Sequence, residues 1–314
     1  MSDVASTTKR PRAGLGPIAR SDGTLAIIAI DQRNTLRKML AAADQPTGPE
    51  DVRSFKVDVT AALSPAASAI LLDPEFGVPA VVLAGAMAPG CGTLVAAEAA
   101  ERDTWHGEPR ARRDPTRTAK WVTDMGGQAL KLFVEMRPDR VRGPGEPDLV
   151  AEVVEVIRAV VEDCAAAGVP SVIETLLYAL PGEGPLDARR RADLIVESAR
   201  ILSETSPDLL KLEYPSDAKG CRAVAEAVTV PWAVLSAGVP LEQFLEAVRT
   251  ACDEGGASGF IAGRVYWKEA VALAGEDRKH FLSTTGRDRL EQSLAAMEGR
   301  ARPWTEAVEG GRSR

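Results

Sequence analysis

The residues Asp208-Leu209-Leu210-Lys211-Leu212-Glu213-Tyr214-Pro215 form a short apolar run that carries one lysine and ends at a proline. A run of this length is typical of a strand that is covered on both faces. A lysine in such a strand is costly, because burial disfavours its charged form and lowers its pKa. A lysine that is neutral near pH 7 can attack a carbonyl and form a Schiff base. The stretch therefore predicts a buried strand with a reactive lysine, Lys211.

Apolar runs of the same kind recur along the chain and alternate with amphipathic helical patterns. The eight expected strands cover residues 24–30, 69–72, 92–96, 129–134, 171–173, 209–212, 232–235 and 259–262. Expected helices cover residues 35–43, 52–63, 148–167, 187–204, 219–227, 241–255 and 287–301. Strands that alternate with helices predict an α/β fold with a parallel sheet. Eight such units in 314 residues favour a single closed (β/α)8 TIM barrel over an open, doubly wound sheet.

The remaining segments define the expected domain limits. We expect residues 1–20 to be a flexible N-terminal arm, residues 21–302 to form the barrel with a C-terminal helical extension, and residues 303–314 to be a polar tail. Two charged, proline-containing stretches, 101–117 and 138–147, follow the third and fourth strands. Both are predicted to be loops at the carboxyl end of the barrel, where loops shape access to a site.

Composition excludes several classes of function. The net charge of -7 argues against a nucleic-acid binder. Four separated cysteines and only two histidines argue against disulfides and against a zinc or His-rich metal site. No dinucleotide fingerprint of the G-x-G-x-x-G kind is present, so we expect no metal and no other cofactor. We find neither a secretory signal peptide nor an apolar stretch near the ~20 residues that span a bilayer. We therefore expect a cytoplasmic protein without a membrane or nucleic-acid partner.

Polar residues lie at the ends of most expected strands, which is where TIM barrels place their active sites. Two of the strands carry lysines, Lys131 and Lys211, and a neighbouring cation makes a nucleophilic lysine more reactive. Alternatively, each lysine forms an ion pair with a carboxylate such as Asp31 or Glu174, and spacing does not decide which lysine reacts. The full set of strand-end candidates is Asp31, Gln32, Arg33, Asp73, Lys131, Glu174, Lys211, Glu213, Ser236 and Arg264.

Carboxylates near the lysines supply candidates for proton transfer. Schiff-base chemistry needs an acid/base group, and Glu174, directly after an apolar strand, is expected to have a raised pKa. Glu213 lies two residues after Lys211, and strand alternation predicts that both lie on one side. We expect Glu213 to be either a second proton-transfer group or a charge partner.

Two glycine turns indicate an anion site. Ser236-Ala237-Gly238 follows the seventh strand and Gly263-Arg264 follows the eighth. TIM barrels commonly bind phosphate with loop N–H groups at these positions, and a guanidinium suits bidentate contact with an oxyanion. The turns therefore predict an anion-binding site, although either could be only a structural turn.

Several longer motifs resemble the class I tagatose 1,6-bisphosphate aldolases and the related 6-deoxy-6-sulfofructose 1-phosphate aldolases. The resemblance covers most of residues 20–300. Its motifs are AIDQR (29–33), FKVDVTAALSPAASAILLDPEFGVPA (55–80), ALKLFV (129–134), IET (173–175), LLKLEYP (209–215), PWAVLSAGV (231–239) and GASGFIAGRVYW (256–267).

The resemblance implies a TIM barrel and a retro-aldol cleavage that needs no metal. It matches Lys211 to the Schiff-base lysine, Glu174 to the catalytic acid/base, and Lys131, Asp31 and Gln32 to further site residues. It matches Ser236, Ala237, Gly238 and Arg264 to anion contacts. By their positions at strand ends, we add Arg33, Asp73 and Gly263 as substrate or anion contacts.

The motifs divide between the two substrate branches. LLDPEFG and TTG (284–286) are similar to the tagatose-bisphosphate enzymes, whereas GGQALKL and MRPDR are similar to the sulfofructose-phosphate enzymes. The loop 101–117 matches neither branch. Whether the far end of the substrate carries a phosphate or a sulfonate therefore stays open.

We expect a class I aldolase that cleaves a phosphorylated ketose into dihydroxyacetone phosphate and a three-carbon aldehyde. Two alternatives stay open: a sugar-phosphate isomerase or epimerase on the same barrel, and a non-catalytic regulator that binds sugar phosphates. The expected partner is the phosphorylated sugar, and by analogy with similar barrels we expect a homo-oligomer.

Overall fold

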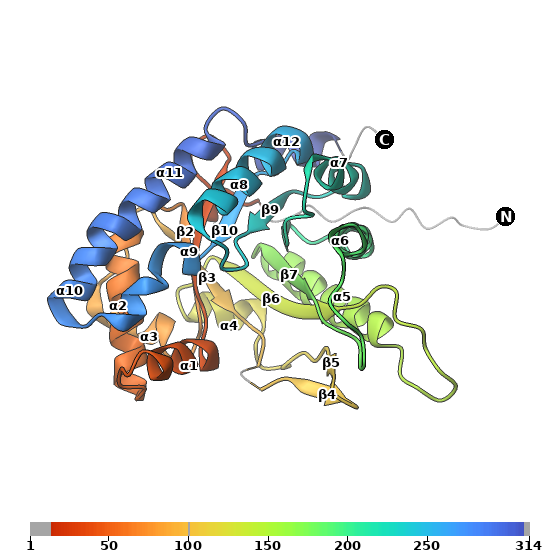
Figure 1. Ribbon diagram of the computed structural model, residues 1–314, viewed down its shortest axis with the longest axis horizontal. Coiled ribbons are helices and arrows are strands. Elements are labelled where there is room, and N and C mark those ends of the chain that lie inside the picture. The colour runs from red at the N-terminus through yellow and green to blue at the C-terminus, as the bar shows by residue number, and fades with distance from the viewer. Residues whose placement is uncertain (1–13, 100, 311–314) are drawn as a thin grey trace.

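A computed structural model describes residues 14–99 and 101–310, and in this part of the chain eight parallel strands close into a barrel (Figure 1). The order around the barrel is β1-β10-β9-β8-β7-β6-β3-β2. Barrel strands that are consecutive along the chain are therefore neighbours in the barrel, with β4 and β5 outside it. The predicted TIM barrel is confirmed. The strands are β1 (Leu25–Ile30), β2 (Ala69–Leu72), β3 (Gly92–Ala96), β6 (Ala129–Met136), β7 (Ser171–Leu177), β8 (Leu209–Leu212), β9 (Trp232–Leu235) and β10 (Gly259–Ala262).

Helices surround the strands (Figure 1). Asp148, Asp187 and Asp217 start α5, α6 and α7, because each carboxylate accepts a hydrogen bond from the backbone N–H three residues later. No helix within the described ranges is long and apolar enough to cross a membrane. The helices are α1 (Asn34–Ala42), α2 (Pro49–Leu63), α3 (Gly77–Ala84), α4 (Ala119–Asp124), α5 (Leu149–Ala167), α6 (Ala188–Ser203), α7 (Ala218–Ala227), α8 (Leu241–Gly255), α9 (Arg264–Trp267), α10 (Gly275–Phe281), α11 (Arg287–Met297) and α12 (Trp304–Gly310).

Strand alternation determines which residues fill the barrel. The inner core contains small and branched apolar residues from alternate strand positions, among them Ala29, Ala96, Ala129, Val172 and Leu209. Side chains two residues apart lie on the same face of a strand, so the residue two positions after each of these also points into the barrel. In all five strands that residue is polar. Those positions are occupied by Asp31, Glu98, Lys131, Glu174 and Lys211.

The amino end of the barrel is covered by a segment that was expected to belong to a flexible arm. A short 3-10 helix, η1 (Gly16–Ile18), places Leu15 and Ile18 in the inner core, where both are buried. That expectation is therefore wrong for residues 14–20, because apolar side chains hold them against the barrel. The rest of the arm, residues 1–13, lies outside the described residues. In the expected polar tail, Trp304 begins α12 and its backbone N–H donates to the Gly23 carbonyl at 3.0 Å, while residues 311–314 lie outside the described residues.

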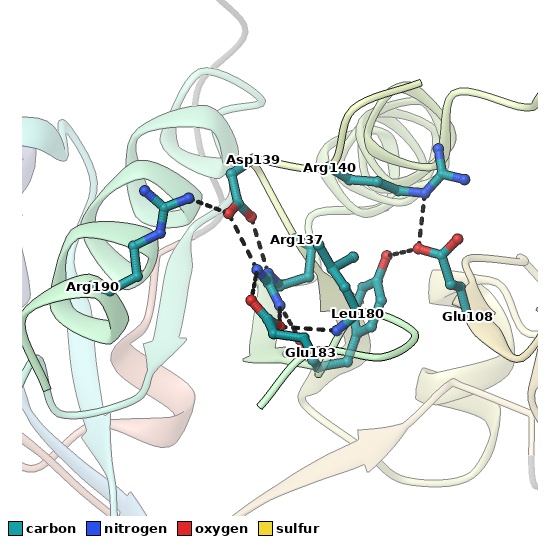
Figure 2. Close-up of polar contacts among 8 residues, drawn as sticks. Glu108, Arg137, Asp139, Arg140, Leu180, Glu183 and Arg190 are labelled. Carbon is teal, nitrogen blue, oxygen red and sulfur yellow. Dashed lines mark hydrogen bonds and ion pairs between the residues drawn. The ribbon is translucent and has the colours of Figure 1, made fainter. Parts of the chain in front are cut away.

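The loop 101–117 contains a hairpin that the sequence did not predict, formed by β4 (Asp103–Trp105) and β5 (Glu108–Arg110). Glu108 accepts hydrogen bonds from Arg140 at 2.8 Å and from the Tyr178 hydroxyl at 2.9 Å (Figure 2). The hairpin is thereby fastened to the loops that follow β6 and β7.

Buried Arg137 joins the same two loops to each other. Its guanidinium lies between Asp139 and Glu183 and donates to the Tyr178 carbonyl at 2.9 Å (Figure 2). Arg190 of α6 contacts Asp139 from the other side at 2.5 Å. Charged hydrogen bonds with several partners make this a cooperative network, so the long loops at the carboxyl end are ordered against one another.

Candidate active site

The inward polar residues converge at the carboxyl end of neighbouring strands. Glu174 on β7 is in register with Lys211 on β8, and Ala96 on β3 is in register with Lys131 on β6. Neighbouring strands lie about 4.8 Å apart. Side chains from adjacent inward positions are therefore within reach of one another, and the structure brings Lys131, Glu174 and Lys211 together as the sequence predicted.

Lys131 is surrounded by carboxylates. Its Nζ lies 2.9 Å from Asp31 Oδ2, 2.8 Å from Glu98 Oε1 and 2.8 Å from Glu174 Oε2. Burial alone would lower the pKa of Lys131, but the three carboxylates outweigh it and hold the pKa well above its ordinary value. Lys131 is therefore a permanent cation at physiological pH.

Glu174 links the two lysines. Its second oxygen, Oε1, lies 2.9 Å from Lys211 Nζ, and Lys211 is almost fully buried. Burial raises the pKa of Glu174, yet the charges of Lys131 and Lys211 outweigh it and lower the pKa below its ordinary value. The expectation of a raised pKa is therefore wrong, because two ammonium groups contact the carboxylate. Both lysines form ion pairs with carboxylates, as in the alternative interpretation of the sequence.

Asp31 is held in place by a third lysine outside the barrel. Lys56 of α2 is fully buried, and its Nζ donates to the Ile30 carbonyl at 2.5 Å and to the Gln32 carbonyl at 2.8 Å. These carbonyls flank Asp31 on both sides. Burial would raise the pKa of Asp31, but Lys131, Lys211 and Lys56 lower it well below its usual range. Asp31 therefore stays ionised beside Lys131.

Asp73 does not contact the site, contrary to expectation. Its Oδ2 lies 2.6 Å from Lys56 Nζ, and both side chains have no exposed surface. Its oxygens also accept from the backbone N–H groups of Glu75, Phe76 and Gly77 at 2.8–3.1 Å. β2 ends at Leu72, so the side chain turns outward to stabilise the following turn. We therefore withdraw Asp73 as a substrate contact.

Glu213 is a charge partner and not a neighbour of the reacting groups. It accepts from the Leu177 N–H at 2.9 Å and pairs with Arg191 of α6. β8 ends at Leu212, so strand alternation no longer aims Glu213 into the barrel. Its carboxylate fixes the end of β7, three residues beyond Glu174.

A cavity of about 480 Å³ opens beside Asp31, Glu98, Lys131 and Glu174. Gln32 Oε1 is buried with no hydrogen-bond partner in the described part of the chain, so a ligand hydroxyl could bond it. Arg33 is nearly buried and is already bound to Glu75 at 2.8 Å and to the Glu98 carbonyl at 3.0 Å. The cavity is lined by Asp31, Gln32, Arg33, Asn34, Thr35, Glu98, Ala99, Arg102, Lys131, Phe133, Glu174, Leu176 and Arg264.

The two glycine turns meet at Arg264. Ala237 and Gly238 both adopt positive φ, at 48° and 81°, and the Val239 N–H donates to the Ser236 carbonyl at 3.0 Å, so residues 236–239 form a tight turn. A Cβ on Gly238 would lie 3.1 Å from the Arg264 Cζ, so the guanidinium packs against this turn. Ser236 just before the turn is mostly buried. A Cβ on Gly263 would lie 2.0 Å from the Ala29 carbonyl, so only glycine allows α9 to begin there.

Glu98 and Lys56 were not among the predicted site residues. Glu98 was visible as a strand-end carboxylate, two positions after the expected strand 92–96. Lys56 lies within a helix, α2, whose sequence gives no sign that the lysine amine reaches the end of strand β1. Among the described residues, no group of three or more His, Cys, Asp or Glu side chains is arranged to hold a metal ion.

Together, the closed barrel and the buried cluster of lysines and carboxylates at its mouth are the architecture of a TIM-barrel enzyme. The chain belongs to the DeoC/LacD family of aldolases, whose family model matches residues 25–269. The protein is therefore an aldolase, which is a lyase.

Known proteins agree with this assignment. A tagatose 1,6-diphosphate aldolase from Listeria monocytogenes is 28% identical over 334 aligned residues, which cover 96% of this chain and 95% of the relative. A fructose-bisphosphate aldolase from Plasmodium falciparum has the same fold with a TM-score of 0.71 and 14% identity, covering 92% of this chain and 94% of that one. A Schiff-base-forming fructose-1,6-bisphosphate aldolase superposes with a TM-score of 0.58 and 17% identity, covering 91% and 98%.

Proposed function

We propose that this aldolase is a class I enzyme that cleaves a phosphorylated ketose through a Schiff base on Lys211. The observation that carries the proposal is the continuous row of ion pairs Lys211–Glu174–Lys131 inside the barrel mouth. It contains the parts that imine chemistry needs: an amine, an acid/base group and a second cation that disfavours another positive charge nearby.

The contacts of the two lysines favour Lys211 as the nucleophile. Lys131 contacts three carboxylates, each of which stabilises its charged form, and its pKa is raised accordingly. Lys211 is paired with a single carboxylate, that of Glu174, within the described residues. Of the two amines, Lys211 is therefore the one less enclosed by negative charge, while Lys131 is held by three carboxylates. This difference between the two lysines supports Lys211 as the nucleophile, a choice that in the sequence depended on the family resemblance alone.

Glu174 then changes its state during the reaction. Glu174 takes the proton of the Lys211 ammonium as the amine attacks the ketose carbonyl carbon, C2, and returns it to the carbinolamine hydroxyl, which leaves as water and gives an iminium ion. Glu174 then accepts the C4 hydroxyl proton while the C3–C4 bond breaks and its electron pair moves into the iminium. This step releases an aldehyde and leaves an enamine, in which Lys211 is no longer charged. Loss of that cation removes one cause of the low Glu174 pKa, so the carboxyl group can next protonate C3. Water then hydrolyses the resulting iminium, which releases dihydroxyacetone phosphate and returns Lys211.

The anion contacts of the ketose are proposed at the turns after β9 and β10. Arg264 has no carboxylate partner among the described residues, and it lies against Gly238 at the edge of the cavity. Ser236, Ala237, Gly238 and Gly263 complete this site, which we assign to the phosphate next to C2. Gln32 is proposed to bond a hydroxyl of the sugar through its free Oε1.

The substrate class follows from the relatives. The Listeria monocytogenes relative is named for tagatose 1,6-diphosphate. We infer that this chain takes tagatose 1,6-bisphosphate or 6-deoxy-6-sulfofructose 1-phosphate, and releases dihydroxyacetone phosphate and a three-carbon aldehyde.

A comparative cleavage assay tests the proposal. Purified protein would be given tagatose 1,6-bisphosphate, fructose 1,6-bisphosphate and 6-deoxy-6-sulfofructose 1-phosphate, each with and without EDTA. We expect cleavage of at least one ketose, unchanged by EDTA, with release of dihydroxyacetone phosphate. Isomerised products without cleavage would indicate the isomerase alternative, and tight binding without turnover would indicate the regulator.

A further inference from the structure

Arg102 lies opposite the proposed anion site, on the other side of the barrel mouth. β9, which carries Ser236–Gly238, is four places from β3 in either direction around the eight-stranded ring of the described chain. Arg102 follows β3, and it lines the same cavity as Arg264. The cavity therefore extends between two guanidinium groups, with the lysine–carboxylate row between them.

Of the cations that line the cavity, Arg102 and Arg264 are the two that a ligand can reach most readily. Arg33 is nearly buried and bound to Glu75 and to the Glu98 carbonyl, and Lys131 is enclosed by carboxylates. Arg102 has a 57% exposed side chain with one ion-pair partner, Glu135. An exposed pair of this kind contributes little to stability, so the exchange of Glu135 for a ligand anion is inexpensive.

Arg102 is also held in a defined place. Its guanidinium lies over the ring of Phe133, with the Cζ 4.5 Å from the ring centroid, and Phe133 itself lines the cavity. The ring contact restrains the guanidinium without using its N–H groups as hydrogen-bond donors. Such a guanidinium can make bidentate contact with a tetrahedral oxyanion.

We propose that Arg102 binds the terminal anionic group of the ketose, the phosphate or sulfonate at the end of the chain remote from C2. The proposal rests on the class I ketose-phosphate aldolase function above. Phosphate and sulfonate both present three terminal oxygens in tetrahedral geometry, so one guanidinium serves either. Arg102 would accordingly be a specificity-determining residue, contributed by the loop 101–117 that the motif comparison left unassigned.

Substrates with and without the distal anion test this role. kcat and KM would be measured with tagatose 1,6-bisphosphate and with tagatose 1-phosphate for the wild type and Arg102→Ala. We expect the substitution to lower kcat/KM for the bisphosphate by about 10- to 100-fold, mainly through KM, the range expected for one charged hydrogen-bonding contact. For the monophosphate, kcat/KM should change by less than about two-fold, because an exposed ion pair such as Arg102–Glu135 matters little to the fold.

Arg112→Ala is the matched control. Arg112 is 56% exposed, pairs with Asp103 in the same loop, and does not line the main cavity. It should leave both substrates unaffected, and Arg102→Lys should recover part of the bisphosphate activity. Equal losses on both substrates, or no loss on the bisphosphate, would overturn the role of Arg102. Wild-type cleavage of the monophosphate reports the aldolase function separately, since that substrate carries no distal anion.

Discussion

Glu174 and Lys211 lie in register on neighbouring strands, and Glu174 Oε1 is 2.9 Å from Lys211 Nζ. The other oxygen of Glu174 contacts Lys131, which is itself held by Asp31 and Glu98. One carboxylate is thus shared between an amine that is fixed as a cation and an amine with no other carboxylate partner in the described residues. This asymmetry between two lysines of similar burial is the basis of the proposed mechanism.

Replacement of the shared carboxylate should abolish most of the activity without unfolding the barrel. Glu174→Gln keeps the size and the hydrogen-bonding capacity of the side chain but cannot transfer the C4 hydroxyl proton. We expect kcat to fall by about 10²- to 10⁴-fold, as is typical for loss of a general acid/base group. Steady-state cleavage kinetics with circular dichroism as a check on folding would measure this.

Glu213→Gln provides the comparison, because Glu213 is also a buried glutamate but bonds Arg191 and the Leu177 N–H. Its loss of kcat should be much smaller than that of Glu174→Gln. Similar losses in the two variants would contradict the assignment of proton transfer to Glu174.

Removal of the fixed cation should change the pH dependence. Lys131 lowers the pKa of Glu174 and of Asp31 in the folded protein. In Lys131→Gln both values should rise, and the acid limb of the kcat/KM profile should move to higher pH by about one unit or more. Lys120→Gln, which removes an exposed lysine paired with Asp124, is the control and should leave the limb unchanged.

The same substitution makes a prediction about stability. A carboxylate whose pKa is lower in the folded state than in the unfolded state stabilises the fold at pH values above its unfolded-state pKa, which is about 4. This contribution is lost as the pH falls through the folded-state pKa. Lys131, whose pKa is raised in the folded state, stabilises the fold at pH values below its unfolded-state pKa of about 10.4. This contribution is lost as the pH rises through the higher folded-state pKa. Urea unfolding should therefore show that Lys131→Gln is destabilised at pH 5 and at pH 7. Unfolding free energies equal to the wild type would contradict the charge arrangement.

The buried pair Lys56–Asp73 should matter for stability and, through Asp31, for activity. Lys56→Met leaves Asp73 buried without its cation, which costs about 3–5 kcal/mol in comparable proteins. Lys56→Met with Asp73→Asn should recover part of this loss, because the amide is neutral. Urea unfolding would give the values, and Lys279→Met, which breaks an exposed pair with Glu276, should change stability by less than about 1 kcal/mol.

The barrel was predictable because its strands are short apolar runs that are buried on both faces. Six of the eight strands have their expected bounds to within one residue, whereas β6 and β7 extend two and four residues beyond the expected ends. The hairpin β4–β5 was not predictable, because Asp103–Trp105 and Glu108–Arg110 carry neither alternation nor an apolar face. Its order comes from contacts that are distant in sequence, such as Glu108 with Arg140 and Tyr178.

The candidate site was predictable where it follows strand alternation and not where the chain turns. Asp31, Lys131, Glu174 and Lys211 occupy inward positions that continue the apolar ones before them. Asp73 follows Leu71 by the same spacing, yet its carboxylate is recruited by Lys56 and by a turn. A partner such as Lys56, on a helix outside the barrel, has no trace in the local pattern.

Reductive trapping of the intermediate tests the central claim most directly. Protein incubated with dihydroxyacetone phosphate and sodium borohydride should gain one covalent adduct, and peptide mass spectrometry should place it on Lys211. The adduct should be absent from Lys211→Arg. An adduct on Lys131, or cleavage that proceeds without any adduct and is abolished by EDTA, would contradict the account.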